Sequence, residues 1–368
     1  MTATSSRHSS AAKASRGEVR VISPAPRSVW QNVWRADPEA VATQAPEWLD
    51  AVCATGAYRD ASRCYQLPGG RTLVLPLVAR RWGGVRLTES SFPAGWGYGG
   101  LLGTSSPTPD ELRLVLADLA RRPMMRVSIT PMPLLAADWT AAAGPGVLRT
   151  PHLTHVIDLR DGWDAVWKRY RPKVRQSVRR AQRSGLEVRC QHGEAAVPVF
   201  NELYGRTVEH WAKQRGRPGW IARLAARYED TTGRLATAAR RLGEACAIWT
   251  AHLDGAPVAA NVTLNSPGHV VGWVSAMDRD LVQQTGASYL LESLAIEEAC
   301  RSGARHFHMG ESDPGTGVAR HKAQLGAREV SYDSLKLERL PLSAAEQTTR
   351  AVVRAISDRG TKRASAQG

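Results

Sequence analysis

Hydrophobic positions along the chain change their period between about two and about four residues, and this change marks the expected strands and helices. In the first half, short alternating runs predict strands and longer runs with helical spacing predict helices. The expected strands are 19–22, 61–67, 71–80 and 125–129. One expected helix begins after Pro46 and continues through Cys53, and a second runs from Pro109 through Leu119.

The second half shows the same alternation with stronger boundary signals. Asp161 and Gly185 bracket a helical segment that Pro172 is expected to break, because proline lacks an amide donor and clashes with the preceding turn. Asp254-Gly255 joins two strands as a hairpin turn. The expected strands are 155–159, 246–252, 258–264, 270–277, 306–310 and 332–340, and the expected helices are 197–211 and 288–300 with a short one near 320.

This alternation predicts an α/β (α+β) fold with central mixed sheets flanked by helices. A chain of 368 residues is long for one hydrophobic core, so two domains are expected. We divide the chain into a disordered tail (1–17), an N-terminal domain (18–140), an Ala/Gly/Pro-rich linker (141–152), a C-terminal catalytic domain (153–340) and a surface helix with a tail (341–368).

Composition points to a cytoplasmic globular protein. No apolar run approaches the roughly 20 residues that span a bilayer, and the N-terminus lacks the apolar core of a secretory signal. The five cysteines are widely spaced and include no Cys-x-x-Cys pair, which favours reduced thiols. Nothing in the pattern fixes an oligomeric state.

Positive charge is concentrated rather than spread. The net charge is +15, and the segment 165–185 contains no acidic residue. Such a patch suits a phosphate-bearing partner, such as a nucleotide, tRNA or lipid headgroup, although Arg-rich composition alone explains it equally well. Arg175, Arg179 and Arg183 are four apart, so they are expected on one helix face. The basic residues of this segment are Lys168, Arg169, Arg171, Lys173, Arg175, Arg179, Arg180 and Arg183.

The first candidate site is the polar turn between strand 270–277 and helix 288–300. A turn that opens a helix presents free backbone N–H groups, and the helix dipole favours an anion there. Capping by Ser288 is the plainer explanation of the same residues. The candidate donor-binding residues are Met277, Gln284, Thr285, Gly286, Ala287 and Ser288.

The second candidate site follows strand 306–310. Glu311 and Asp313 are candidate proton acceptors for an attacking amine. Lys322 and Arg320 are candidate cations for a phosphate or an acyl carbonyl. The plain alternative is a solvated loop followed by an ordinary helix start.

No metal site is expected. His306 and His308 share a face of one strand, but a third ligand is not evident. The chain also contains no Gly-x-Ser-x-Gly, Ser-x-x-Lys or P-loop motif, which argues against common hydrolases and NTPases.

Several runs together resemble one family, the FemAB-like and BioF2-like branch of the GNAT N-acetyltransferases. The resemblance covers about residues 20–340. It rests on the order and spacing of short motifs rather than on one diagnostic run. These include Gly97-Tyr98-Gly99-Gly100, Gly255-Pro257-Ala259-Ala260, Tyr289-Leu290-Leu291 and Gly310…Pro314-Gly315…Gly317…Arg320-His321-Lys322…Gly326-Ala327.

The resemblance implies two tandem GNAT-like domains and transfer of an acyl group to an amine. The donor is then acyl-CoA, such as acetyl-CoA, or an aminoacyl-tRNA, used as a co-substrate rather than as a tightly bound cofactor. The turn after Gln283 carries one glycine where CoA-using members carry two, so both donors remain open. The expected substrate-binding residues are Arg175, Arg179, Tyr289 and Arg320.

Our first hypothesis is therefore an N-acyltransferase for an amine on a cell-envelope, sugar or peptide substrate. Backbone N–H groups near Ser275–Met277 are candidate donors to the carbonyl oxygen. The alternatives are an aminoacyl-tRNA-dependent transferase that forms peptide bonds, and a non-catalytic GNAT scaffold or nucleic-acid-binding module that uses the basic helix.

Overall fold

The computed structural model describes residues 18–82, 85–214 and 231–344, and its largest feature is one mixed sheet of eleven strands. These strands are β2 (Tyr58–Asp60), β5 (Val78–Trp82), β6 (Val85–Ser90), β8 (Arg126–Ile129), β9 (Leu148–Asp158), β10 (Glu187–His192), β11 (Cys246–Leu253), β12 (Ala256–Asn265), β13 (His269–Met277), β14 (His306–Glu311) and β15 (Arg328–Glu338).

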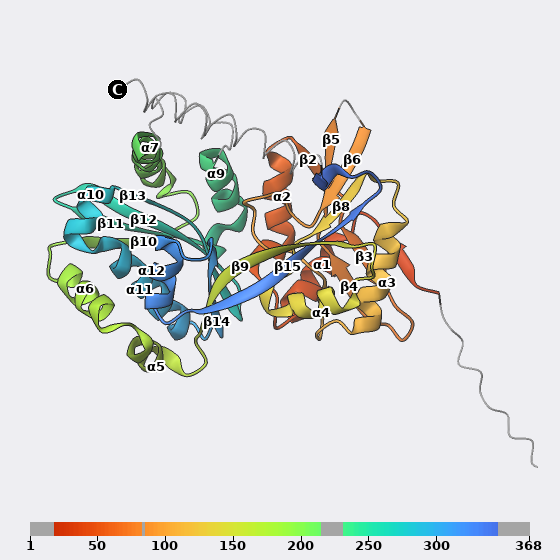
Figure 1. The fold of residues 1–368 in the computed structure, drawn as a ribbon, viewed down its shortest axis with the longest axis horizontal. Coiled ribbons are helices and arrows are strands. Elements are labelled where there is room, and N and C mark those ends of the chain that lie inside the picture. The colour runs from red at the N-terminus through yellow and green to blue at the C-terminus, as the bar shows by residue number, and fades with distance from the viewer. Residues whose placement is uncertain (1–17, 83–84, 215–230, 345–368) are drawn as a thin grey trace, which may run out of the picture.

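The order across this sheet is β10-β11-β12-β13-β14-β9-β15-β8-β6-β5-β2, so it runs through both halves of the chain (Figure 1). Each half contributes one parallel pair, β6 with β8 and β13 with β14. A smaller sheet orders β1-β3-β4-β7. Its strands are β1 (Arg20–Ile22), β3 (Arg63–Gln66), β4 (Thr72–Leu75) and β7 (Leu102–Gly103).

Helices flank the sheets in both halves. They are α1 (Arg27–Ala36), α2 (Pro46–Ala54), α3 (Pro109–Ala120), α4 (Ala136–Ala142), α5 (Gly162–Arg169), α6 (Pro172–Gln182), α7 (Val197–Gln214), α9 (Thr231–Leu242), α10 (Arg279–Thr285), α11 (Ala287–Arg301) and α12 (Gly317–Gln324). Three short 3₁₀ turns are η1 (Ala42–Gln44), η2 (Pro133–Leu135) and η3 (Gly243–Ala245). The predicted α/β class is confirmed.

Local sequence explains the helix boundaries that matter for the site. Pro172 occupies the first turn of α6 and Tyr170 is extended, which gives the predicted break between α5 and α6. Asp161 stands at the N-cap position of α5 without a capping hydrogen bond from its side chain. Asp278 caps α10 by accepting a hydrogen bond from the Leu281 amide at 3.2 Å.

Two helical layers cover the C-terminal part of the large sheet. On one face, α5, α6 and α11 pack against β9, β13 and β14 through buried residues such as Val178, Ile296 and Phe307. On the other face, α7 and α9 pack against β11 and β12 through Phe200 and Leu235. Because both faces of the sheet are covered, the sequences of these strands are nearly continuous apolar runs.

A tryptophan cluster joins the two halves. Trp48, Trp96 and Trp273 have ring centroids 4.9–6.0 Å apart. The Trp273 indole donates to the Gly95 carbonyl at 3.0 Å. The glycine-rich loop of the first half (residues 95–100) therefore packs against β13 of the second half.

The boundaries differ from the predicted domain limits in one place. The expected linker 141–152 is not all loop, because β9 begins at Leu148 and pairs with β15 along its length. We retain the division into residues 18–140 and 153–340 as a proposal. The predicted tails lie outside the described residues, apart from 341–344. Within the described ranges, none of the helices has the length and apolar character needed to cross a membrane.

The tryptophan cluster yields a stability prediction. Trp48 is fully buried, so Trp48→Ala is expected to lower the free energy of unfolding by about 3–5 kcal/mol. Trp163 is only partly buried, so Trp163→Ala should cost clearly less. Urea denaturation followed by circular dichroism measures both variants, and equal losses would show that the cluster does not hold the halves together.

Candidate active site

The site begins where β13 and β14 stop pairing. The two strands are hydrogen-bonded only from His269–Val271 to His306–His308 and then separate. The register of β12 against β13 also shifts between Val262 and Thr263, and that of β14 against β9 shifts between His308 and Glu311. Irregularities on both sides bend the strands apart, as β-bulges do.

Two glycines allow this separation. A Cβ on Gly272 would lie 3.4 Å from the His308 carbonyl oxygen, at the point where the strands part. Gly310 has a φ of +75°, a left-handed conformation that other residues rarely adopt. The opening is therefore built into the backbone.

A cavity of about 950 Å³ occupies this opening. β12, β13 and β14 form one side of it, and residues of α6, α7, α10, α11 and α12 also line it. It brings together several of the predicted residues, which are Met277, Gly286, Ser288, Tyr289, Glu311, Arg320 and Lys322.

The hydrogen-bond pattern of β13 indicates a backbone donor for this cavity. The Met277 N–H donates to the Thr207 hydroxyl at 3.0 Å, so it is already engaged. Asp278 donates to the Val258 carbonyl of β12. Because hydrogen bonding alternates along a strand, the Ser275 N–H points toward the open side, away from β12. Ser275 is thus the best candidate among the predicted carbonyl donors.

The predicted turn 283–288 has a different form in the structure. Gln283, Gln284 and Thr285 end the short helix α10, and Gly286 both ends α10 and begins α11 with a φ of +77°. Ser288 lies in the first turn of α11, so the expectation that it caps the helix was wrong. A Cβ on Gly286 would lie 3.2 Å from the Ser177 carbonyl oxygen, so this glycine also lets α6 approach.

Three of the expected donor-binding residues do not border the cavity. Thr285 is buried and its hydroxyl donates to the Leu281 carbonyl at 2.7 Å, while Ala287 is fully buried. Gln284 is exposed but does not line the cavity. The available groups are instead the backbone N–H groups of Ser288 and Tyr289, which have no partner within their own helix.

Lys322 is the buried cation of the site. Only 7% of the residue is exposed, and its Nζ donates to the carbonyls of Gly310 and Glu311, both at 2.8 Å. Burial lowers its pKa to about 8, and the charges of Glu292 and Glu311 offset only part of that effect. An ammonium group has three donors, so one remains for a ligand in the cavity.

Glu311 is held as a carboxylate. Its two oxygens contact the Tyr332 hydroxyl and, at 3.4 Å, the Nδ1 atom of His152. The hydrogen bond from His152 lowers the pKa of Glu311, assisted by Tyr332 and by the charge of Lys322. A carboxyl with a lowered pKa is a weak base, so Glu311 is better suited to binding a cationic amine than to removing its proton.

A histidine–carboxylate pair completes the site. The Nε2 atom of His321 contacts a carboxylate oxygen of Glu292, and the ring stacks on Tyr289 with centroids 4.4 Å apart. Burial opposes the charged form, but the charge and hydrogen bond of Glu292 outweigh it and raise the pKa of His321. If the carboxylate accepts the Nε2 proton, Nδ1 is left as the basic nitrogen. No local sequence pattern predicts this pair, because its members come from two different helices, α11 and α12.

The remaining predicted residues lie away from the cavity. Arg175 donates to the carbonyls of Lys168 and Tyr170, where it ties the end of α5 to α6. Arg179 is exposed on another side of α6. The α6 residues that line the cavity are Ser177 and Arg180. Asp313 is exposed in the following loop and is not among the lining residues.

The strand histidines form a separate buried cluster. His308 is fully buried, and its Nε2 atom lies 3.0 Å from Nδ1 of His269. Burial lowers the pKa of His308 well below its usual value, so the ring is neutral. Across the described ranges, no group of three or more His, Cys, Asp or Glu side chains is arranged to hold a metal.

The fold and this site define an acyltransferase. Residues 168–323 match the family described as the acetyltransferase (GNAT) domain. This segment contains β13, β14, α11 and Lys322, so the cavity lies within a GNAT acetyltransferase domain. Residues 168–323 are therefore a GNAT acetyltransferase domain, and this supports the acyltransferase activity that the sequence resemblance implied.

Solved structures extend the fold similarity to both halves. FemX has a TM-score of 0.61 at 9% identity, covering 89% of this chain and 99% of FemX. A conserved protein of unknown function from Bacteroides thetaiotaomicron VPI-5482 has a TM-score of 0.55 at 10% identity, covering 84% of this chain and 95% of its own. At such identities the likeness concerns the fold alone. No curated protein matches the chain.

The His321–Glu292 pair can be tested without knowing the substrate. Glu292→Gln removes the charge that raises the pKa of His321, so burial and Lys322 should then lower it. Titration of the imidazole resonances by NMR measures the change. Glu244→Gln removes an exposed carboxylate near His192 and should leave His321 unaffected. An unchanged pKa in Glu292→Gln would contradict the pairing.

Proposed function

We propose that the chain is an N-acyltransferase that moves an acyl group from acyl-CoA to a primary amine of a cell-envelope, sugar or peptide substrate. The observation that carries this proposal is the cavity between the parted strands β13 and β14. It combines a free strand N–H group, a buried lysine and the start of a long helix. A thioester with an anionic tail needs these three elements.

The phosphate end of the donor would bind at the start of α11. The N–H groups of Ser288 and Tyr289 face the cavity end of a 15-residue helix, whose dipole favours an anion. Arg180 and Arg320 line the same cavity and carry positive charge. The combination supports pyrophosphate binding although the sequence has only one glycine here.

The acyl carbonyl would bind between Ser275 and Lys322. As the amine nitrogen attacks the carbonyl carbon, negative charge develops on the carbonyl oxygen. A preorganised N–H group and an ammonium group stabilise that charge. Collapse of the tetrahedral intermediate forms the amide bond, breaks the carbon–sulfur bond and releases the thiolate of CoA, which takes up a proton.

His321 is the residue we assign as the proton acceptor. Glu292 raises the pKa of His321, which makes the imidazole a stronger base. Glu292 would position the ring and stabilise the imidazolium that forms. Glu311 would hold the acceptor ammonium before deprotonation, and Asp313 has no assigned contact in this arrangement.

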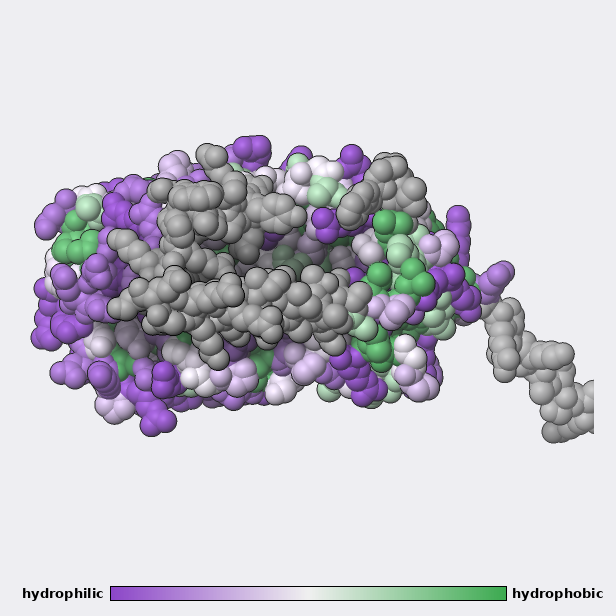
Figure 2. Space-filling view, turned by 45° about the horizontal axis from the view of Figure 1, so that its top comes forward, coloured by the Kyte–Doolittle hydropathy of each residue, from purple (hydrophilic) through white to green (hydrophobic). Residues whose placement is uncertain are grey.

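An aminoacyl-tRNA donor is the second candidate. Exposed basic residues of α6 and its C-cap, among them Arg179 and Arg183, lie outside the cavity and suit a nucleic-acid backbone. In the view of Figure 2, the end of the molecule that carries α6 and α10 is largely hydrophilic. Both donors are intracellular molecules, so we also propose that the reaction occurs in the cytoplasm.

Substitutions at two neighbouring arginines distinguish between the two proposed donors. Arg180→Glu is expected to weaken acetyl-CoA binding by roughly 10-fold or more, because a charge-assisted phosphate contact is replaced by repulsion. Arg179→Glu is the matched control on the same helix and should bind acetyl-CoA normally. Isothermal titration calorimetry measures both. Binding of charged tRNA that depends on Arg179, with no binding of acetyl-CoA, would replace the proposal by the second candidate.

The lowered pKa of Lys322 predicts how kcat/KM changes on the alkaline side of its pH profile. The charged form is lost as the pH rises through about 8, so kcat/KM should fall above that pH. Lys322→Arg keeps its charge to far higher pH, so that fall should disappear. Lys322→Met should lower kcat by about 10²–10³-fold. Steady-state kinetics with a fixed amine tests this, and near-normal turnover in Lys322→Met would exclude the assigned role.

A further inference from the structure

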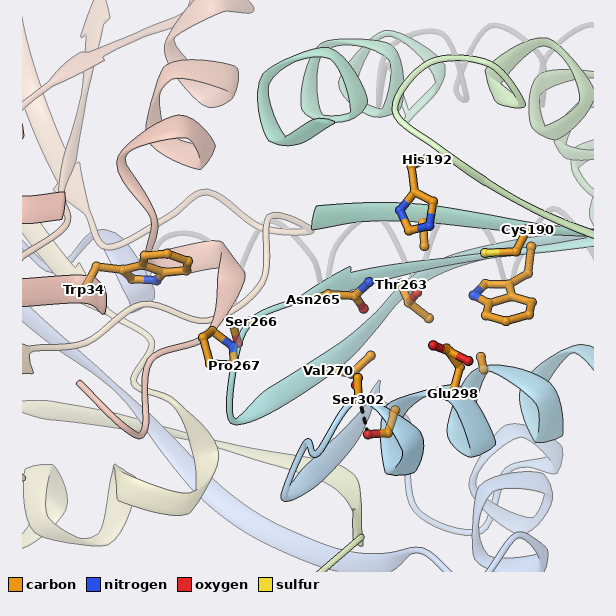
Figure 3. Close-up of a pocket in the computed structure, with 14 residues that line it drawn as sticks. Trp34, Cys190, His192, Thr263, Asn265, Ser266, Pro267, Val270, Glu298 and Ser302 are labelled. Atoms are coloured by element: carbon orange, nitrogen blue, oxygen red, sulfur yellow. Dashed lines mark hydrogen bonds between the residues drawn. The ribbon is translucent and has the colours of Figure 1, made fainter. Parts of the chain in front are cut away.

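A second cavity of about 560 Å³ adjoins the reaction cavity on the same face of the sheet. It lies between the edge strand β10 and the C-terminal part of α11, where Glu298 and Ser302 face the strands (Figure 3). Its lining residues also come from β11 and β12.

The two cavities meet at small side chains. Thr263 of β12 and Ala295 of α11 line both of them. Thr263 is paired with Gly272, which is where β13 and β14 begin to part. The lining residues of α11 and its C-cap include Ser288, Glu292, Ala295, Ala299 and Ser302. This spacing of three and four puts them on one face of the helix, so the cavities follow one continuous side of α11.

The chemistry of the lining changes with distance from the reaction cavity. Near the junction the walls are apolar, with Ala247, Val270 and Ala299. Farther out they become polar, with Asn265, His192 and Ser302.

Charge in this cavity is low for so basic a chain. None of its lining residues is Lys or Arg, and the one carboxylate, Glu298, is paired with Arg301 of its own helix. The Trp249 indole N–H is buried among these residues without a protein partner. The cavity therefore offers an apolar passage with neutral hydrogen-bonding groups at its far end.

We infer that this cavity receives the distal part of the donor acyl group, so that the enzyme prefers a medium-length acyl thioester to acetyl. This inference rests on the proposed function, because it assigns the acyl chain to a donor already bound between β13 and β14. The carbonyl stays at Ser275 and Lys322, and the chain passes Thr263 and Ala295. The bonds formed and broken are those of the transfer itself.

Chain length is the variable to test. Wild-type protein is assayed with acetyl-CoA, butyryl-CoA and hexanoyl-CoA and one fixed amine. Each methylene that enters the apolar passage should lower KM roughly fourfold, the factor that corresponds to burial of one CH₂ group. The preference should level off once the chain reaches the polar end.

Filling the second cavity provides the specific control. Ala247 lines only this cavity, so Ala247→Leu should remove the preference for hexanoyl-CoA and leave acetyl transfer unchanged. Because Ala247 is buried, Ser302→Trp, at an exposed position near the far end, is the second variant. It should shorten the longest accepted chain.

The outcomes separate the two proposals. Acetyl transfer without any dependence on chain length overturns this inference alone. Equal losses of acetyl and hexanoyl transfer in both variants also overturn it, because filling the cavity then acts on the whole fold. Absence of turnover with every acyl-CoA overturns the proposed function and this inference with it.

Discussion

The parting of β13 from β14 is the constraint on which the site depends. Two neighbouring parallel strands that separate leave backbone N–H and C=O groups unpaired, and buried groups of this kind must find other partners. Lys322 donates hydrogen bonds to the Gly310 and Glu311 carbonyls. The Thr207 hydroxyl donates to the Met277 carbonyl and accepts from the Met277 N–H. The gap is stabilised by these contacts, while the Ser275 N–H group points toward its open side.

The same contacts set the electrostatics of the cavity. Lys322 is buried between carbonyl oxygens and near two carboxylates, one of which is paired with His321. Charges in a partly dry site interact more strongly than they do in water. Burial lowers the pKa of Lys322 to about 8, while Glu292 raises that of His321. In the proposed reaction, carbonyl binding and proton transfer are therefore linked through Glu292, which lies near both Lys322 and His321.

Much of the fold was predictable from the sequence, and the site was predictable in part. Periodicity and boundary residues placed most helices and strands, including the break at Pro172. The short helix α10 was missed although Asp278 is a good N-cap residue, because the glycine at 286 suggested an open turn instead. The apolar positions of α6 show which side of the helix packs, but not which polar side meets the cavity. The sequence therefore predicts Arg179 at a place where the structure has Arg180. The pairing of His321 with Glu292 depends on how two helices meet, and no local pattern encodes that.

The most direct test of the central claim is a crystal structure with a non-reactive thioether analogue of acetyl-CoA, in which a ketone carbonyl stands in for that of the thioester. We predict that the carbonyl oxygen lies within hydrogen-bond distance of the Ser275 N–H between β13 and β14, with the pyrophosphate at the N–H groups of Ser288 and Tyr289. An analogue bound on the outer face of α6, with the space between the strands left empty, would contradict the account.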